Sequence, residues 1–153
     1  MRLKTAAPIA LAFAAGLLAG PWTTDLLRDA HAQAVPLAPA AIDIAALTDA
    51  DLSATPNPDL RSKTLVVTDQ ATLAVQTGNV AKHYHAKSDE IQYIVEGTGT
   101  AWLGDRLVDI KPGMLLVIPK GTAHAGTVPS SGRFKAIAIK VPPQANGDTV
   151  LLE

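Results

Sequence analysis

The chain has 153 residues, of which 48% are hydrophobic and 18% are charged, and its net charge is −1. One domain with a real core fits this length, whereas two domains do not. No run of lysine or arginine forms a basic patch, which argues against binding to nucleic acid. The absence of cysteine excludes disulfides, thiolate metal ligands and cysteine nucleophiles.

The N-terminus has the pattern of an export signal. Arg2 and Lys4 precede an apolar stretch at residues 5–20 that is rich in alanine and leucine. This stretch is short for a membrane-spanning helix, which needs about 20 apolar residues. We expect residues 1–34 to be a signal peptide, and the long polar spacer at residues 21–30 keeps an uncleaved membrane anchor open as the alternative.

Two small-residue cleavage patterns follow the spacer, Ala-His-Ala at residues 30–32 and Ala-Gln-Ala at residues 32–34. They predict a mature chain that starts at Gln33 or Val35. The protein is then periplasmic or secreted, or else anchored to the membrane and facing the periplasm. Because no twin-arginine pair is present, we expect the chain to cross the membrane unfolded and to acquire its metal outside the cytoplasm.

Residues 35–63 are expected to form an arm or linker. The segment is rich in alanine, proline and aspartate, with one helix-compatible piece at Ile44–Leu52 and a stiff turn at Pro56-Asn57-Pro58. Such an arm packs across the outside of a domain or onto a partner subunit, or it stays a solvated linker, and composition does not decide between these. It contains no candidate metal ligand.

An all-β domain is predicted for residues 64–141, followed by a loose C-terminal tail at residues 142–153. Short apolar runs there are separated by glycine, proline and aspartate, and they lie at residues 65–67, 73–75, 91–95, 114–118 and 134–141. Gly104-Asp105 is typical of a hairpin, and Lys111-Pro112-Gly113 of a type II turn. Because several strands lack charges that would block an edge, closure into a barrel or pairing with a second subunit would protect them, and we expect a homodimer.

Every histidine after the export signal lies in one two-part pattern. Its first part is Gly78-x4-His83-x-His85-x4-Glu90-x6-Gly97, and its second part is Gly113-x5-Pro119-x-Gly121-x2-His124. Alternate side chains of a strand point to the same face, so His83 and His85 can reach one ion together. Glu90 returns across a polar turn, and His124 comes from a distant strand. Three imidazoles and one carboxylate leave open positions on one divalent transition metal, which is Fe, Mn, Ni, Co or Zn.

These two motifs resemble those of the cupin superfamily, in particular its small single-domain bacterial members of the type-2 kind. The resemblance covers roughly residues 65–141. It implies a double-stranded antiparallel β-barrel, a jelly roll, that holds the metal in its interior. Two positions depart from the family pattern. Gly78 lies one residue nearer to the histidines than usual, and Val128 stands where an asparagine is common, so no role of that asparagine is carried over.

Three further residues are predicted to line the pocket. Gln92 shares the inward face with Glu90 and either touches a ligand or supports a metal ligand. Tyr93 alternates to the other face, which favours packing, and Trp102 either walls the pocket or fills the barrel. The inward positions offer mostly aliphatic side chains, so the pocket is expected to be small and apolar apart from the metal. Three basic residues are expected to be solvated: Lys120, Arg133 and Lys135.

Function is less determined than fold, because the cupin resemblance implies a scaffold shared by oxygenases, isomerases, decarboxylases, lyases and non-catalytic binders. The first hypothesis is a metalloenzyme of the oxygenase, isomerase or lyase type that acts on a small polar metabolite. The second is a non-catalytic cupin of the cell envelope that binds a small ligand or a metal. A third, a purely structural ion, requires that protein buries every coordination position. No second carboxylate or spare histidine lies on the ligand face of the motif strands, so no proton shuttle is evident there.

Overall fold

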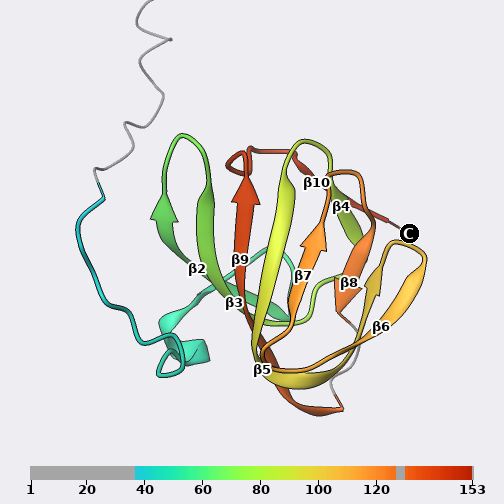
Figure 1. The fold of residues 1–153 in the computed structure, drawn as a ribbon, viewed down its shortest axis with the longest axis horizontal. Helices are drawn as coiled ribbons and strands as arrows, with labels where there is room; N and C mark the ends of the chain where they lie inside the picture. The colour runs from blue at the N-terminus through green and yellow to red at the C-terminus, as the bar shows by residue number, and fades with distance from the viewer. Residues whose placement is uncertain (1–36, 127–129, 153) are drawn as a thin grey trace, which may run out of the picture. The chain divides into compact units, whose positions relative to one another are not determined.

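The structure is a computed structural model, and it describes residues 37–126 and 130–152. This part of the chain contains ten strands and one short 3-10 helix, and the strands pair antiparallel throughout (Figure 1). The predicted all-β class is therefore confirmed. The elements are η1 (Asp49–Asp51), β1 (Ser53–Ala54), β2 (Leu60–Val67), β3 (Thr72–Gly78), β4 (His83–His85), β5 (Asp89–Leu103), β6 (Arg106–Ile110), β7 (Leu115–Ile118), β8 (His124–Gly126), β9 (Ser131–Val141) and β10 (Thr149–Leu151).

Strand β5 joins the two sides of the barrel. Its first half pairs with β7 and β9, whereas its second half pairs with β6 and β8. The register against β9 shifts on both sides of Glu96, where the strand passes Gly97. Gly97 has a φ of +85°, and a Cβ there would lie 2.9 Å from the carbonyl oxygen of Arg133. The last glycine of the first motif is therefore required by the bend of β5 against β9.

The core fills the inside of the barrel with aliphatic and aromatic side chains. Along β7, Leu116 and Ile118 are buried, whereas Leu115 and Val117 are 58% and 59% exposed. The inward set packs in a cluster with Ile94, Ala101, Ile110 and Phe134. Burial of each large aliphatic side chain stabilises the fold by roughly 1.5–3 kcal/mol.

Both predicted turns are present. Gly104 and Asp105 form the two-residue loop between Leu103 and Arg106, and Gly104 has a φ of +65°. In the second turn the amide of Met114 donates to the carbonyl of Lys111 at 3.2 Å, and Gly113 has the positive φ that a type II turn needs.

Residues 45–59 of the arm contact the outside of the barrel, so this part of it is not a solvated linker. Arg133 pairs with Asp49 at 3.1 Å and with Asp59 at 2.9 Å, which ties the arm to β9. The helix-compatible piece forms only η1, and the strands of the sheet begin with β1 at Ser53 rather than at residue 64. No longer helix forms here. Residues 45 and 49 instead make polar contacts with Lys135 and Arg133 of β9.

Lys135 differs from the expectation of a solvated side chain. It is only 6% exposed. Its ammonium donates to Glu96 Oε1 at 2.6 Å and to the carbonyl of Ala45 in the arm at 3.1 Å. These two acceptors replace the water that a buried ammonium gives up.

Residues 142–152 include a strand that pairs with the barrel, so the expectation of a loose tail was wrong. This strand is β10, which pairs with the histidine strand β4 and places Val150 opposite Tyr84. The carbonyl of Asp148 also accepts the amide of Ala86 at 2.9 Å. The segment contributes backbone bonds to the strand that carries two predicted metal ligands.

None of the helices formed by the described residues is long and apolar enough to cross a membrane.

The predicted export signal and its cleavage patterns lie outside the described residues. The predicted homodimer also stays a prediction. The outer face of the barrel offers it an apolar surface, since Tyr93 pairs with Leu115 and Ile91 pairs with Val117 across β5 and β7.

Candidate metal centre

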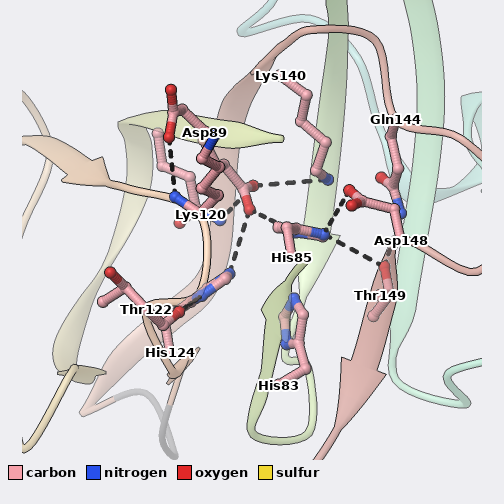
Figure 2. Close-up of polar contacts among 12 residues, drawn as sticks. His83, His85, Asp89, Lys120, Thr122, His124, Lys140, Gln144, Asp148 and Thr149 are labelled. Carbon is pink, nitrogen blue, oxygen red and sulfur yellow. Dashed lines mark hydrogen bonds and ion pairs between the residues drawn. The ribbon is translucent and has the colours of Figure 1, made fainter. Parts of the chain in front are cut away.

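The structure brings the four predicted ligand residues together. His83 and His85 come from β4, Glu90 from the start of β5 and His124 from β8, and all four are buried. One ligand atom from each lies within 4.8 Å of the others. Strands β4 and β8 pair directly at His83 and His124, which is why two distant motifs meet at one point (Figure 2).

The outer nitrogens of the imidazoles have partners that orient the rings. His83 Nδ1 donates to the carbonyl of Ala81 at 2.8 Å, and His124 Nδ1 donates to the carbonyl of Thr122 at 3.0 Å. His85 Nδ1 lies 3.4 Å from Asp148 Oδ2, and Figure 2 shows Asp148 on the side of His85 opposite His124. These contacts leave the Nε2 atoms available to an ion, an arrangement common in protein metal sites.

The two carboxylate oxygens of Glu90 have different neighbours: one lies near the imidazoles, and the other lies near Gln92 and Lys140. Its Oε2 lies 2.9 Å from His85 Nε2 and 3.1 Å from His124 Nε2. Its Oε1 accepts a hydrogen bond from Gln92 at 2.9 Å and lies 3.7 Å from Lys140 Nζ. Three oriented imidazoles around one carboxylate oxygen fit a divalent transition metal.

The electrostatics favour the protonation states that bind metal. Burial, with the neighbouring His124, lowers the pKa of His83 to about 4. For Glu90, burial alone would raise the pKa, but the hydrogen bonds from His124 and His85 outweigh it and hold the pKa well below its usual range. At neutral pH the site therefore has a neutral His83 and an ionised Glu90.

We expect the metal-free protein to lose stability as the pH falls from about 6.5 to about 4. Over this range the unfolded chain binds a proton at His83 that the folded chain does not bind. The free energy of unfolding therefore falls by at most about 3 kcal/mol, and Glu90 adds a loss in the same direction at lower pH. Urea unfolding at pH 7 and pH 4 measures the change, and His83→Gln should flatten it. Equal stability at both pH values would contradict the lowered pKa of His83.

A cavity of about 650 Å³ opens beside the cluster, with His83, His85 and Glu90 in its wall. The cavity is larger than the small pocket that was expected, because the arm and the C-terminal segment add walls to the barrel. The polar side chains that line the cavity come from all three parts: Thr55, Asn57, Ser62, Gln76, Gln92, Lys140, Gln144, Asn146 and Thr149.

The structure separates the three predicted pocket residues. Gln92 lines the large cavity. Tyr93 is 43% exposed on the outer face and does not line it, because alternation turns its side chain away from Gln92. Trp102 lines a small neighbouring cavity of about 60 Å³ together with His124, and Lys82 lies over its ring at 4.8 Å.

Sequence reasoning missed two charged residues at the site, Lys140 and Asp148. Lys140 pairs with Glu90 across β9 and β5, so correct pairing of these strands would have placed it on the inward face. Asp148 lies in the segment predicted to be a loose tail. No local pattern marked it as a partner of His85.

Residues 70–140 match the family model of the cupin domain. These residues are a cupin domain. An uncharacterized protein of Methanocaldococcus jannaschii is 36% identical over 75 residues, which cover 46% of this chain and 57% of that protein. The cupin therefore spans little more than half the length of this curated relative.

Solved structures share the fold at low sequence identity. KdgF from Halomonas sp. has a TM-score of 0.54 at 21% identity, and the alignment covers 60% of this chain and 86% of KdgF. Pac13 from Streptomyces, described as a nucleoside dehydratase, has a TM-score of 0.56 at 15% identity, with 69% and 88% covered. A protein from Klebsiella pneumoniae with a double-stranded β-helix domain has a TM-score of 0.57 at 15% identity, with 70% and 96% covered. The predicted double-stranded barrel is confirmed.

Proposed function

We propose that this cupin is a metal-dependent enzyme of the oxygenase, isomerase or lyase type that acts on a small polar metabolite. One observation carries the proposal. Three of the four ligand residues form part of the wall of a cavity of about 650 Å³. Coordination positions that the protein does not fill therefore face space that a small molecule can enter. The cavity argues against a purely structural ion.

The roles of the residues follow from their contacts. His83, His85, His124 and Glu90 would hold the ion, which supplies Lewis acidity or activates O₂ when bound. Gln92 fixes the orientation of Glu90 through its hydrogen bond. The polar side chains of the cavity orient the substrate by hydrogen bonds and exclude water from the reacting atoms.

The fold neighbours are compatible with the lyase option. Pac13 is described as a nucleoside dehydratase, and variants of it are solved with uridine, so a barrel of this size can hold a small polar molecule. At 15% identity this likeness concerns the fold, and the substrate of this cupin is proposed from its own residues.

A non-catalytic cupin of the cell envelope, binding a small ligand or a metal, is the second candidate. It is favoured by the absence of a second carboxylate or spare histidine among the described residues that line the large cavity. Their histidines and their carboxylate belong to the ligand set. Asp148, the carboxylate behind His85, is held by the amide of Lys87 at 2.6 Å.

The deciding experiment is a turnover screen on metal-loaded protein. Elemental analysis first identifies the native metal. Small carboxylates, carbonyl compounds, sugars and nucleosides are then tested for conversion and O₂ uptake. We expect conversion that stops on chelation, returns with the metal and is missing in His124→Ala. Ligand binding without conversion of any compound would instead support the non-catalytic candidate.

Export remains part of the proposal and is supported by the N-terminal pattern of residues 1–34. An exported cupin would take its metal from the periplasmic supply. Comparison of metal content between protein purified from the periplasm and protein held in the cytoplasm tests this point, because identical contents would contradict it.

A further inference from the structure

We propose that the ligand of this cavity is a small organic carboxylate, whose anionic group pairs with Lys140 while another of its oxygens faces the ion. The inference rests on the proposed metal-dependent function and names the chemical class of its ligand. It makes Lys140 the residue that selects a charged ligand over a neutral one.

Lys140 is placed inside the barrel by the pairing of β9 with β5. It lies opposite Glu90 in the register and is only 8% exposed. Figure 2 shows its side chain extending toward the ligand cluster. Lys140 also forms part of the wall of both the large cavity and a neighbouring one of about 250 Å³. A molecule bound beside the ion therefore meets this group.

The ammonium of Lys140 has no hydrogen-bond acceptor among residues 37–126 and 130–152. Its contact with Glu90 Oε1, at 3.7 Å, is an ion pair that is too long for a hydrogen bond. Gln92 already donates to that oxygen. Lys135, on the same strand and equally buried, shows the usual solution, because it donates to Glu96 and to the carbonyl of Ala45.

An ammonium without a protein acceptor needs acceptors from the cavity, which water or a bound ligand supplies. A carboxylate provides them as charge-assisted hydrogen bonds, which are stronger than bonds to a neutral group. The amides of Gln76, Gln92 and Gln144 also line the cavity and can bind the uncharged part of the ligand.

The charge balance also favours an anion. Among the residues that line the cavity, the charges of Glu90 and Lys140 cancel, and the histidines are neutral when they bind metal. Asp148 behind His85 adds one negative charge, and a divalent ion adds two positive charges. The loaded site is therefore net positive by one charge, which a single carboxylate neutralises.

The competing interpretation is that Lys140 only neutralises Glu90. Its removal would then change the affinity for the metal, and the charge of the ligand would not matter. Carboxylate binding to loaded protein separates the two interpretations, because it measures the ligand and the ion independently.

The test titrates Co²⁺-loaded full-length protein with oxalate, lactate, pyruvate and succinate, and with the corresponding neutral amides. The visible absorption of Co²⁺ and the heat of binding are recorded. We expect at least one carboxylate to bind roughly 10- to 100-fold more tightly than its amide. Lys140→Met should remove this preference with Co²⁺ affinity little changed, Lys140→Arg should retain most of it, and the exposed Lys120→Met should behave as wild type.

Four outcomes overturn one proposal or the other. If Co²⁺ binds and no carboxylate is preferred over its amide, or if Lys140→Met keeps the preference, the carboxylate inference is wrong. If Lys140→Met loses Co²⁺ affinity and keeps the preference, the residue is a partner of Glu90 only. If the wild-type protein binds no divalent metal, the proposed function itself fails.

Discussion

Replacing His124 with alanine should lower the affinity for a divalent transition metal by on the order of 100-fold or more, while the β-sheet content stays the same. Loss of residues that merely orient metal ligands costs about 10- to 100-fold, so loss of a ligand should cost at least as much. His124 also supports Glu90 Oε2 at 3.1 Å. Its contacts to polar atoms of the site are separate from the aliphatic cluster that fills the barrel. Competition with a chromophoric chelator measures the affinity, and circular dichroism measures the fold.

Tyr84 offers a matched control for this experiment. It lies between His83 and His85 on the same strand, and alternation directs it to the opposite face. Tyr84→Leu should therefore keep its metal. Unchanged metal occupancy in His124→Ala, or an equal loss of metal in both variants, would contradict the assignment of His124 as a metal ligand.

Replacing Asp148 with alanine should weaken metal binding by roughly 10- to 100-fold, the usual effect of removing a group that orients a ligand. The carboxylate lies 3.4 Å from His85 Nδ1 and accepts the amide of Lys87 at 2.6 Å. Its loss removes the group that orients the ring of His85. It also leaves the backbone amide of Lys87 without an acceptor, which costs about 1–3 kcal/mol of stability if no water replaces the carboxylate. Metal titration and urea unfolding of the metal-free protein measure the two effects separately.

Two further variants separate charge from shape at this position. Asp148→Asn keeps an acceptor for Lys87 but removes the negative charge beside His85, so it should lose metal affinity and keep most of the stability. Asp105→Ala, at the exposed tip of the β5–β6 hairpin, should change neither. Metal affinity of Asp148→Ala equal to that of Asp105→Ala would show that the carboxylate does not orient His85.

The barrel strands and the ligand set could be predicted because their signals are local. His83 and His85 are two residues apart on one strand, and Gly113 follows a proline in a tight turn, so each pattern is complete within a few residues. The packing of the arm could not be predicted in this way. It depends on ion pairs such as Arg133 with Asp59, whose partners are 74 residues apart.

The two buried lysines of β9 show a second limit. Lys135 faces Glu96 and the arm, whereas Lys140 faces Glu90 and the cavity. Alternation along β9 puts residues 135 and 140 on opposite faces, but only the pairing with β5 places Lys140 beside Glu90. That pairing joins segments far apart in the sequence, so the charged group of the pocket was not recognised.

The wall of the cavity has a consequence for how ligand choice can change. The candidate metal ligands lie on barrel strands, whereas residues 55–58 of the arm and residues 144–147 before β10 close the space around them. Substitutions in these two segments leave the ligand strands intact. Related chains can therefore change their ligand selectivity by substitutions in these two short segments. The same segments are the positions at which selectivity could be engineered without changing the metal ligands.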